Sequence, residues 1–241
     1  MSLDTGKRYL VVIPARGGSK RLPGKNLMEI GGCSLIGRAI NSVKGLAEVR
    51  GICISTDDRM IADEAMRHGP YVPFMRPEHL ATDGAKTVDV VMHAIQWFAD
   101  GGECFDAVIL LQPTSPLRTR QHVLDAIHLY EERKADAVVS VCKLEHPIEW
   151  CAELGPDGSM ATFGANLNTQ KRSQELGQKY RLNGAIYIYD IQRLMQEKGF
   201  FYSARTYAYE MDLPSSTDVD TYDDFLLATF WENLTSGTPN E

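Results

Sequence analysis

The stretch that decides the fold is Tyr9–Asn26, YLVVIPARGGSKRLPGKN. It begins as an apolar, β-branched run and breaks into a loop at Pro14, Gly17 and Gly18. This pattern predicts a buried strand that ends in a loop, where glycines let the backbone approach a ligand closely. Cations crowd the same loop, namely Arg16, Lys20, Arg21 and Lys25. The stretch therefore predicts the first strand of a sheet with a basic loop at its carboxyl end.

The basic loop is interpreted as a cradle for the phosphates of a nucleoside triphosphate. Backbone N–H groups and cations after a buried strand are what such loops use. The alternative is a solvated basic turn, because single Lys and Arg residues are mostly exposed. The loop fits no standard template: Ser19 and Asn26 stand where a Walker loop needs Gly and Ser or Thr, and no G-x-G-x-x-G occurs. The sequence predicts a phosphate loop of a different kind.

Composition limits the class of protein. The 241 residues are 44% hydrophobic and 24% charged, which suits one α/β domain or one domain with an appendage. A net charge of −7 argues against general binding to nucleic acid or membranes. The chain has no apolar run of membrane-spanning length and no signal-peptide core, and its five cysteines are scattered and odd in number. We expect a soluble cytoplasmic protein.

Strand-like and helix-like segments alternate along the chain. Strands are expected at 9–14, 51–55, 106–111, 135–142 and 182–189, with a possible edge strand at 206–211. Helices are expected at 34–44, 58–68, 86–99, 121–133, 191–198 and 219–234, with Ser34, residues 56–58, and Thr82 or Asp83 as caps. This alternation predicts a three-layer α/β/α, Rossmann-like domain around a mostly parallel sheet.

Two features interrupt the simple alternation. Gln112–Arg118, QPTSPLR, forms a second polar loop after a buried strand, and ligands collect at that edge of open α/β sheets. Residues 143–180 are richer in Gly, Pro, Asn and Gln, and Gly155–Gly158 reads as the turn of a hairpin. We expect the insertion 143–180 to project from a single domain that spans 1–241.

Two late carboxylates suggest a metal site. Asp218 and Asp220 would point the same way along an extended backbone, which suits Mg²⁺, while a role as helix cap is the alternative. The histidines show no metal-binding spacing, and no G-x-S-x-G occurs. Arg172 and Arg181, in or beside the insertion, are candidates for contact with an anionic substrate.

Six motifs, in this order, resemble the N-acylneuraminate cytidylyltransferases, the CMP-sialic acid synthetases, and their legionaminic and pseudaminic acid relatives. The resemblance covers nearly the whole chain. The motifs are VVIPARGGSKRLPGKN (11–26), STDD (55–58), RPEHLA (76–81), LLQPTSPLR (110–118), YRLNGAIY (180–187) and DVDT (218–221).

The resemblance implies CTP-dependent activation of a nonulosonic acid. Its anomeric hydroxyl would attack the α-phosphate of CTP and release pyrophosphate, and an enzyme with Mg²⁺ as cofactor is expected. Matched motif by motif, Arg16, Gly17, Ser19, Lys20, Lys25, Asn26 and Arg76 would bind the nucleotide; Gln112, Thr114, Ser115, Arg172 and Arg181 the sugar acid; and Asp218 and Asp220 the metal. Arg16, Lys20, Asp218 and Asp220 would act in catalysis. The insertion would be a dimerisation arm, so a homodimer is implied.

The arm departs from the family pattern. Lys171-Arg172-Ser173 stands where two adjacent arginines are common, so Ser173 removes one cation. Two alternatives stay open: a nucleotidyltransferase for another sugar such as Kdo, whose first loop usually reads differently after Pro-Ala-Arg, and a non-catalytic nucleotide-binding paralogue. The sequence does not determine which sugar is the substrate, because the ring substituents are recognised by the shape of the pocket.

Overall fold

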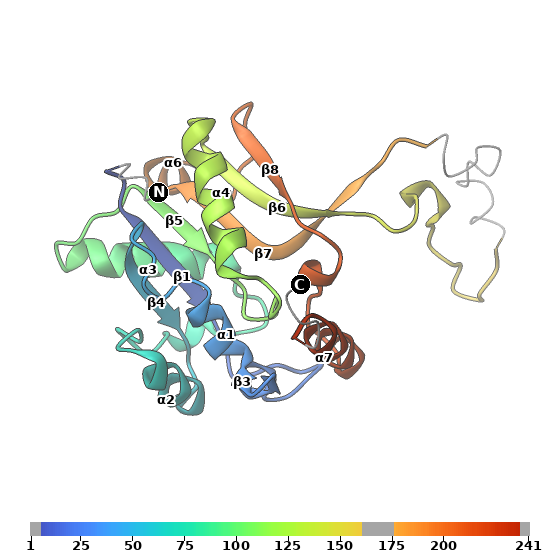
Figure 1. The fold of residues 1–241 in the computed structure, drawn as a ribbon, viewed down its shortest axis with the longest axis horizontal. Coiled ribbons are helices and arrows are strands. Elements are labelled where there is room, and N and C mark those ends of the chain that lie inside the picture. The colour runs from blue at the N-terminus through green and yellow to red at the C-terminus, as the bar shows by residue number, and fades with distance from the viewer. Residues whose placement is uncertain (1–5, 161–175, 237–241) are drawn as a thin grey trace.

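A six-stranded sheet forms the centre of the computed structural model, which describes residues 6–160 and 176–236. Its order is β4 (Val49–Ser55), β1 (Tyr9–Pro14), β5 (Ala107–Leu110), β7 (Tyr180–Asp190), β6 (Ala137–Lys143) and β8 (Thr206–Glu210). Only β7 is antiparallel to its neighbours, β5 and β6; the other pairs are parallel (Figure 1). The expected mostly parallel sheet is confirmed.

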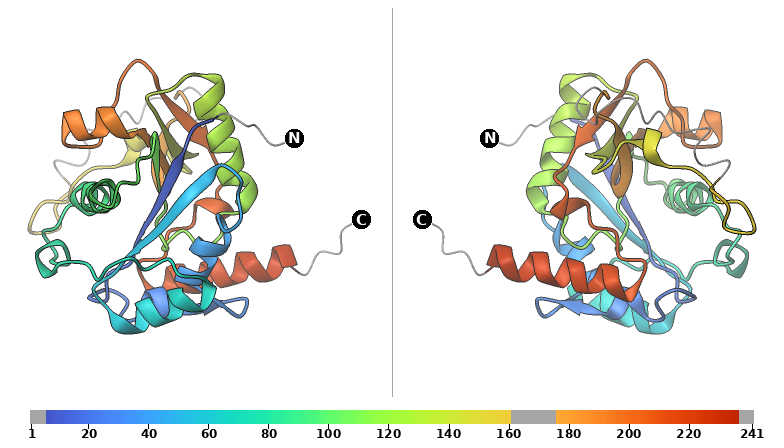
Figure 2. Two further views of the ribbon diagram at one scale, coloured as in Figure 1. Left: turned by 90° about the vertical axis from the view of Figure 1, so that its left-hand side faces the viewer. Right: turned by 90° about the vertical axis from the view of Figure 1, so that its right-hand side faces the viewer.

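Helices cover both faces of this sheet. On one face lie α1 (Leu35–Asn41) and α4 (Arg120–Glu132), with α2 (Arg59–His68) beside α1; on the other lie α3 (Thr87–Asp100) and α6 (Ile191–Glu197) (Figure 2). Strand β1 is apolar throughout because its residues alternate between the hydrophobic cores on the two faces of the sheet. All of them from Tyr9 to Ile13 are fully buried. The three layers are as expected.

Helix α7 (Tyr222–Ser236) lies below the sheet and closes the described chain (Figure 2). It begins three residues later than expected, after Thr221, whose Oγ1 accepts a hydrogen bond from Asp224 N at 3.3 Å. The Asp224 carboxylate in turn accepts from Thr221 N at 2.8 Å. Thr221 and Asp224 therefore form the cap, and neither Asp218 nor Asp220 is needed for it.

The other helix starts follow local chemistry. Ser34 caps α1 by accepting from Gly37 N, and Asp58 caps α2 by accepting from Met60 N and Ile61 N, as expected. Helix α3 differs, because it begins after Lys86 without a side-chain cap, so Thr82 and Asp83 are free for other contacts. The remaining short elements are β2 (Glu29–Ile30), β3 (Cys33–Ser34), and the 3-10 turns at Lys25–Leu27, Glu78–Leu80, Ile148–Trp150 and Pro214–Ser216.

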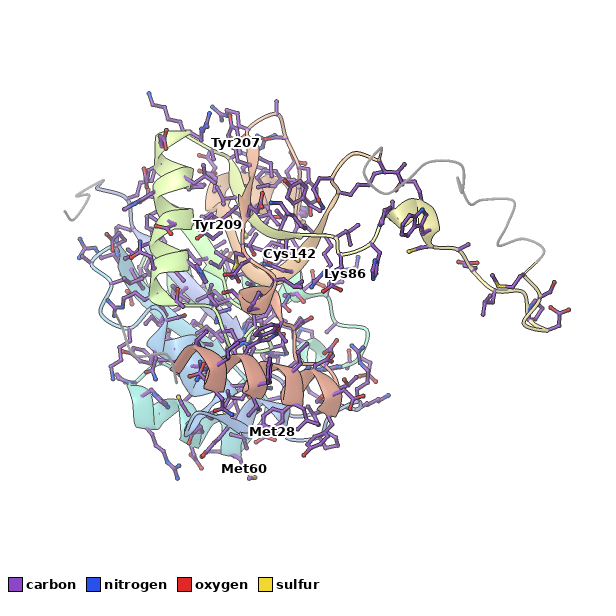
Figure 3. All side chains as sticks on the ribbon, turned by 45° about the vertical axis from the view of Figure 1, so that its right-hand side comes forward. Met28, Met60, Lys86, Cys142, Tyr207 and Tyr209 are labelled. Atoms are coloured by element: carbon purple, nitrogen blue, oxygen red, sulfur yellow. The ribbon has the colours of Figure 1, made fainter. Side chains whose placement is uncertain are left out.

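An arm leaves the sheet between β6 and β7. Its stem is closed by the pairing of Lys143 with Tyr180 and by a 2.8 Å hydrogen bond from Leu144 N to Lys179 O. Beyond Glu145, which still lines a pocket with residues of the body, the segment 146–160 extends away from it (Figure 3). The expected turn forms, since Gly158 N donates to Gly155 O at 2.9 Å, but no strands flank it among the described residues.

Two broader expectations can be compared with the described chain. None of its helices has the length and apolar character needed to cross a membrane. All five cysteines lie within the described ranges, and all are free thiols.

Candidate functional site

A cleft of about 510 Å³ opens at the carboxyl ends of β1 and β5, where both predicted polar loops meet. A third wall comes from the segment between Arg76 and Val90, and Asp220 reaches in beside the first loop. Of the residues predicted from sequence, those that line the cleft are Arg16, Ser19, Lys20, Lys25, Asn26, Arg76, Gln112, Thr114 and Asp220. Its size suits a ligand larger than a single phosphate.

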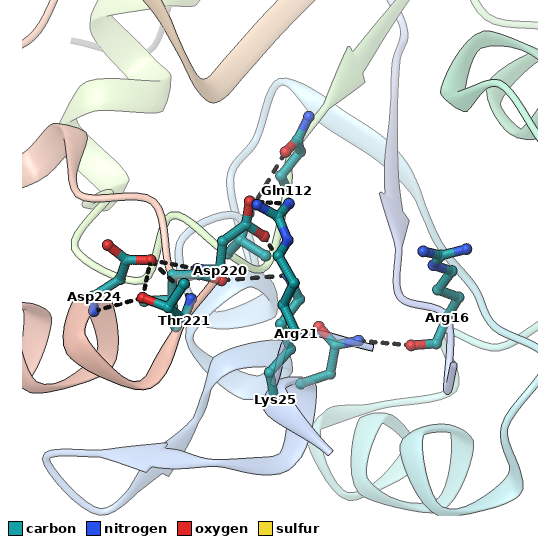
Figure 4. Close-up of polar contacts among 10 residues, drawn as sticks. Arg16, Arg21, Lys25, Gln112, Asp220, Thr221 and Asp224 are labelled. Atoms are coloured by element: carbon teal, nitrogen blue, oxygen red, sulfur yellow. Dashed lines mark hydrogen bonds and ion pairs between the residues drawn. The ribbon is translucent and has the colours of Figure 1, made fainter. Parts of the chain in front are cut away.

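The cations of the first loop each face a carboxylate. Asp83 lies 3.0 Å from Arg16 Nη1 and 2.5 Å from Lys20 Nζ, and the Lys20 ammonium holds the pKa of Asp83 below its usual value. Asp220 lies 2.5 Å from Arg21 Nη2 and 2.8 Å from Lys25 Nζ (Figure 4). The positive charge predicted for this loop is therefore gathered in the cleft, with carboxylates at the positions that an anionic ligand would occupy.

Gly17 lies against the start of α2, and its predicted role in nucleotide binding stays a prediction. Its N–H donates to Asp57 Oδ1 at 3.1 Å, and a Cβ on Gly17 would lie 2.5 Å from Asp58 Oδ2. The N–H of Ser19 is likewise engaged, by Gly17 O at 2.9 Å. The first loop is thus held against the start of α2, and the N–H groups of Gly17 and Ser19 both donate to groups of the protein. Gly17 does not line the cleft.

Asn26 and Arg76 are buried residues that fix the shape of the cleft. Asn26 Nδ2 donates to Arg16 O at 3.0 Å and holds the loop closed (Figure 4). Arg76 Nε donates to Ser55 Oγ at 3.0 Å, and its guanidinium also contacts Ser55 O. Burial lowers the pKa of Arg76, although the nearby Asp57 charge opposes this. Both residues line the cleft, and these hydrogen bonds fix the position of their side chains there.

The second loop contributes Gln112 and Thr114 but not Ser115. Ser115 is fully buried, and its Oγ has no hydrogen-bond partner within the described ranges. Arg118 lies beneath the loop and is also buried; its Nη1 donates to Gln112 O at 3.0 Å and Ala185 O at 2.9 Å. Burial lowers the pKa of Arg118 to about 9, so it remains a cation at neutral pH. Ser115 is therefore a residue of the loop's interior.

The two late aspartates separate. Asp220 lines the main cleft, whereas Asp218 lines a second cleft of about 370 Å³ together with Arg181. Burial raises the pKa of Asp218, and the charge of Asp220 adds to this, while a hydrogen bond with Thr114 opposes it. Asp218 Oδ1 is buried and has no hydrogen-bond partner within the described ranges. Arg172 lies outside the described residues.

Sequence reasoning missed several residues of the main cleft. Arg21 was recognised only as a cation of the loop, and Asp83 only as a helix cap, yet both make ion pairs in the cleft. Thr82 and Thr87 line it as well. The available signal was the polar run after Arg76, which falls in the connection between α2 and α3, and connecting loops often carry binding residues.

Comparisons with known proteins point to one family. The model of the cytidylyltransferase family matches residues 10–230. The CMP-N,N'-diacetyllegionaminic acid synthase of Legionella pneumophila is 34% identical over 91% of this chain and 94% of its own length. The N-acylneuraminate cytidylyltransferase of Streptococcus agalactiae serotype V is 36% identical over 90% of this chain, which spans only 51% of that relative.

A solved structure shares the fold. CMP-2-keto-3-deoxy-manno-octonic acid synthetase in complex with CTP covers 96% of this chain with a TM-score of 0.69 at 17% identity. At that identity the likeness concerns the fold alone. From the family match over most of its length, the chain belongs to the cytidylyltransferase family.

Proposed function

We propose that this protein transfers the cytidylyl group of CTP to a nonulosonic acid and releases pyrophosphate. One observation carries the proposal: Arg16, Lys20 and Lys25 line the same cleft as Gln112 and Thr114. A triphosphate and a hydroxylated acid could thus meet in one cavity. The curated relatives, whose names describe CMP-legionaminic and N-acylneuraminate synthesis, support this choice of substrates.

The reaction requires neutralised charge and an aligned attack. The anomeric hydroxyl of the acid gives up its proton to water, its oxygen forms a bond to the α-phosphorus, and the bond from that phosphorus to the bridging oxygen breaks as pyrophosphate leaves. Arg16 and Lys20 would bind the phosphates and stabilise the leaving charge. Asn26 and Arg76 would keep the nucleotide side of the cleft in shape, and Gln112 and Thr114 would orient the acid.

Asp220 in the main cleft and Asp218 in the neighbouring cleft are the carboxylates that would hold a magnesium ion, because the charge of Asp220 acts on the Asp218 carboxyl group although the two line different clefts. Mg²⁺ is commonly held by one or two carboxylates together with phosphates and water. Asp218 Oδ1 is a buried acceptor without a partner within the described ranges, and the charge of Asp220 reaches it. Arg21 and Lys25 now hold Asp220, so those cations would shift toward the phosphates. Bound there, Mg²⁺ would neutralise phosphate charge.

We also propose that the protein is a homodimer joined through the arm. The arm exposes large apolar side chains: Ile148 is 56% exposed, Leu154 59% and Met160 55%, and Trp150 is 40% exposed. Such a group on an extended segment suits burial against a second copy. Trp150→Asp should shift the sedimentation coefficient from dimer to monomer, whereas the exposed body residue Met60→Asp should not.

A cytoplasmic location remains part of this proposal. Five free thiols are consistent with a reducing compartment.

The deciding experiment measures pyrophosphate release with CTP and Mg²⁺. The acids to compare are N-acetylneuraminic acid, legionaminic acid, pseudaminic acid and Kdo. For each acid, ATP, GTP and UTP replace CTP in control reactions. Release with CTP and one nonulosonic acid supports the proposal and names the sugar. Release with Kdo alone would favour the other-sugar alternative, and CTP binding without release from any acid would favour a non-catalytic paralogue.

A further inference from the structure

Strand β7 carries a large bulge beside the cleft. Its pairing with β6 jumps from Val139 opposite Tyr187 to Val141 opposite Leu182, so Ser140 alone faces residues 183–186. Gly184, inside the bulge, has a φ of +75°, and a Cβ there would lie 3.2 Å from Gln112 Oε1. Bulges next to binding sites redirect nearby groups. This one lies directly against a residue of the cleft.

Asn183 holds the bulge through a buried network. Its side chain is 2% exposed, and its Oδ1 accepts from Ser140 Oγ at 2.6 Å and Ala185 N at 3.2 Å. Its Nδ2 donates to Ser216 Oγ at 2.9 Å and contacts Met211 Sδ at 3.3 Å. Only an amide offers acceptor and donor together in this way, and a satisfied buried network specifies one arrangement.

One side of the network leads to Gln112. The carbonyl of Ala185, within the bulge, accepts from Arg118 Nη1, and the same Nη1 donates to Gln112 O. A Cβ on Gly184 would come within 3.2 Å of Gln112 Oε1, so only glycine leaves room for the Gln112 side chain here. The bulge therefore lies next to the Gln112 side chain and is joined to its backbone through Arg118.

The other side leads to the late aspartates. Ser216 Oγ, the acceptor for Asn183, donates to Asp212 O at 2.6 Å and so fixes the turn that precedes Asp218. Beyond that turn, Val219 N donates to Thr114 O at 2.7 Å, which joins the segment to the second loop. Asn183 therefore bonds to Ala185 of the bulge, on the Gln112 side, and to Ser216, on the side of the late aspartates.

We propose that Asn183 is a positioning residue that sets Gln112 relative to the segment 212–220. It touches neither substrate; it acts through Ser216 on one side and through the bulge on the other. The inference rests on the proposed function, because Gln112 is the residue expected to meet the sugar acid there. Among the described residues, Arg16 and Lys20 bond to Thr82 and Asp83 and not to this network, and of the cations expected to bind CTP only Lys25 reaches the segment 212–220, through Val219 O and Asp220. Nucleotide binding should therefore depend on the network less than binding of the sugar acid does.

The test compares Asn183→Ser and Ser216→Ala with wild type. Both should keep the dissociation constant for CTP, measured by calorimetry in EDTA, within about twofold. Both should lower kcat and raise KM for the sugar acid, with kcat/KM falling about tenfold or more. Ser216→Ala covers the case in which Asn183→Ser does not fold, because it removes one hydroxyl and leaves the bulge contacts in place.

Ile188→Val is the matched control, since Ile188 is fully buried in the same strand and outside the bulge. It should lower the urea midpoint and leave kcat and KM unchanged. The proposal is overturned if the Asn183 and Ser216 variants also lose only stability and keep wild-type kcat and KM. If wild type itself releases no pyrophosphate with any acid, the proposed function fails, and this inference falls with it.

Discussion

The carboxylate of Asp83 lies 2.5 Å from the ammonium group of Lys20, and both residues line the cleft. Thr82 O also accepts from Arg16 Nη1 at 3.3 Å, so the loop before α3 lies over both cations. A triphosphate would need those cations. A triphosphate bound as proposed would compete with Asp83 for Lys20 and Arg16.

Asp83→Asn should tighten CTP binding by about twofold to fivefold, because removing an exposed ion pair frees Lys20 and Arg16 for the phosphates. Calorimetric titration with CTP measures this. The control is Asp63→Asn, an exposed acid on α2. Weaker binding in Asp83→Asn would mean that Asp83 helps the nucleotide to bind, and the competition described above would be wrong.

Lys20→Met should lower kcat about 10²-fold to 10³-fold, because it removes a cation directed at the charge that develops on the leaving group. Steady-state pyrophosphate release measures this. Arg50→Met is the control: Arg50 is exposed near the start of β4, at the end of the strand opposite the cleft. Near-normal turnover in Lys20→Met would remove that residue from the proposed mechanism.

Adjacent glycines give a matched pair for stability. Gly17→Ala should destabilise the fold by about 1–3 kcal/mol, because its Cβ would meet Asp58 at 2.5 Å. Gly18→Ala should change the free energy of unfolding by less than about 0.5 kcal/mol, since nothing lies within 4 Å of its Cβ. Urea denaturation compares the two. Equal losses would show that the contact with Asp58 is not what requires glycine.

Asp218 should make stability depend on pH. Burial raises its folded pKa above the unfolded value of 3.8, so the folded state holds a proton more tightly. Its contribution to stability is therefore favourable at pH below the unfolded pKa and is lost as pH rises through the folded pKa. Without metal, Asp218→Asn should unfold at higher urea than wild type at pH 8, and this difference should shrink at pH 4.

Magnesium provides the second half of that test. Mg²⁺ should raise the urea midpoint of wild type at pH 8 and should have little effect on Asp218→Asn, because binding to the folded state adds stability. Asp223→Asn, at an exposed position of α7, should respond like wild type. An unchanged magnesium response in Asp218→Asn would exclude that carboxylate as a ligand.

The sequence was most informative where chemistry is local. The runs that became β1 and β5 are buried on both faces, so their apolar character marks them without any knowledge of neighbours. Ser34 and Asp58 cap helices through bonds two or three residues away. The two polar loops could be placed on one edge because parallel strands share their carboxyl ends.

The missed features depend on distant partners. Asp83 and Arg16 are 67 residues apart, and nothing in a polar loop indicates which cation it will meet. The direction of β7 was equally hidden, because an apolar strand reads the same in either orientation. Gly17 suggested close approach of a ligand, whereas the close group is the Asp58 carboxylate. Each of these is decided by tertiary packing.

Because the stem of the arm is closed by strand pairing, the length of the arm can change without changing the sheet. Since Lys143 and Tyr180 already pair, the sheet bears almost the same loop-closure entropy whatever length of chain joins them. Segments within 145–178 can therefore be lengthened, shortened or exchanged while β6 and β7 stay in register. The sheet that holds the cleft can therefore stay unchanged while the length of the arm varies.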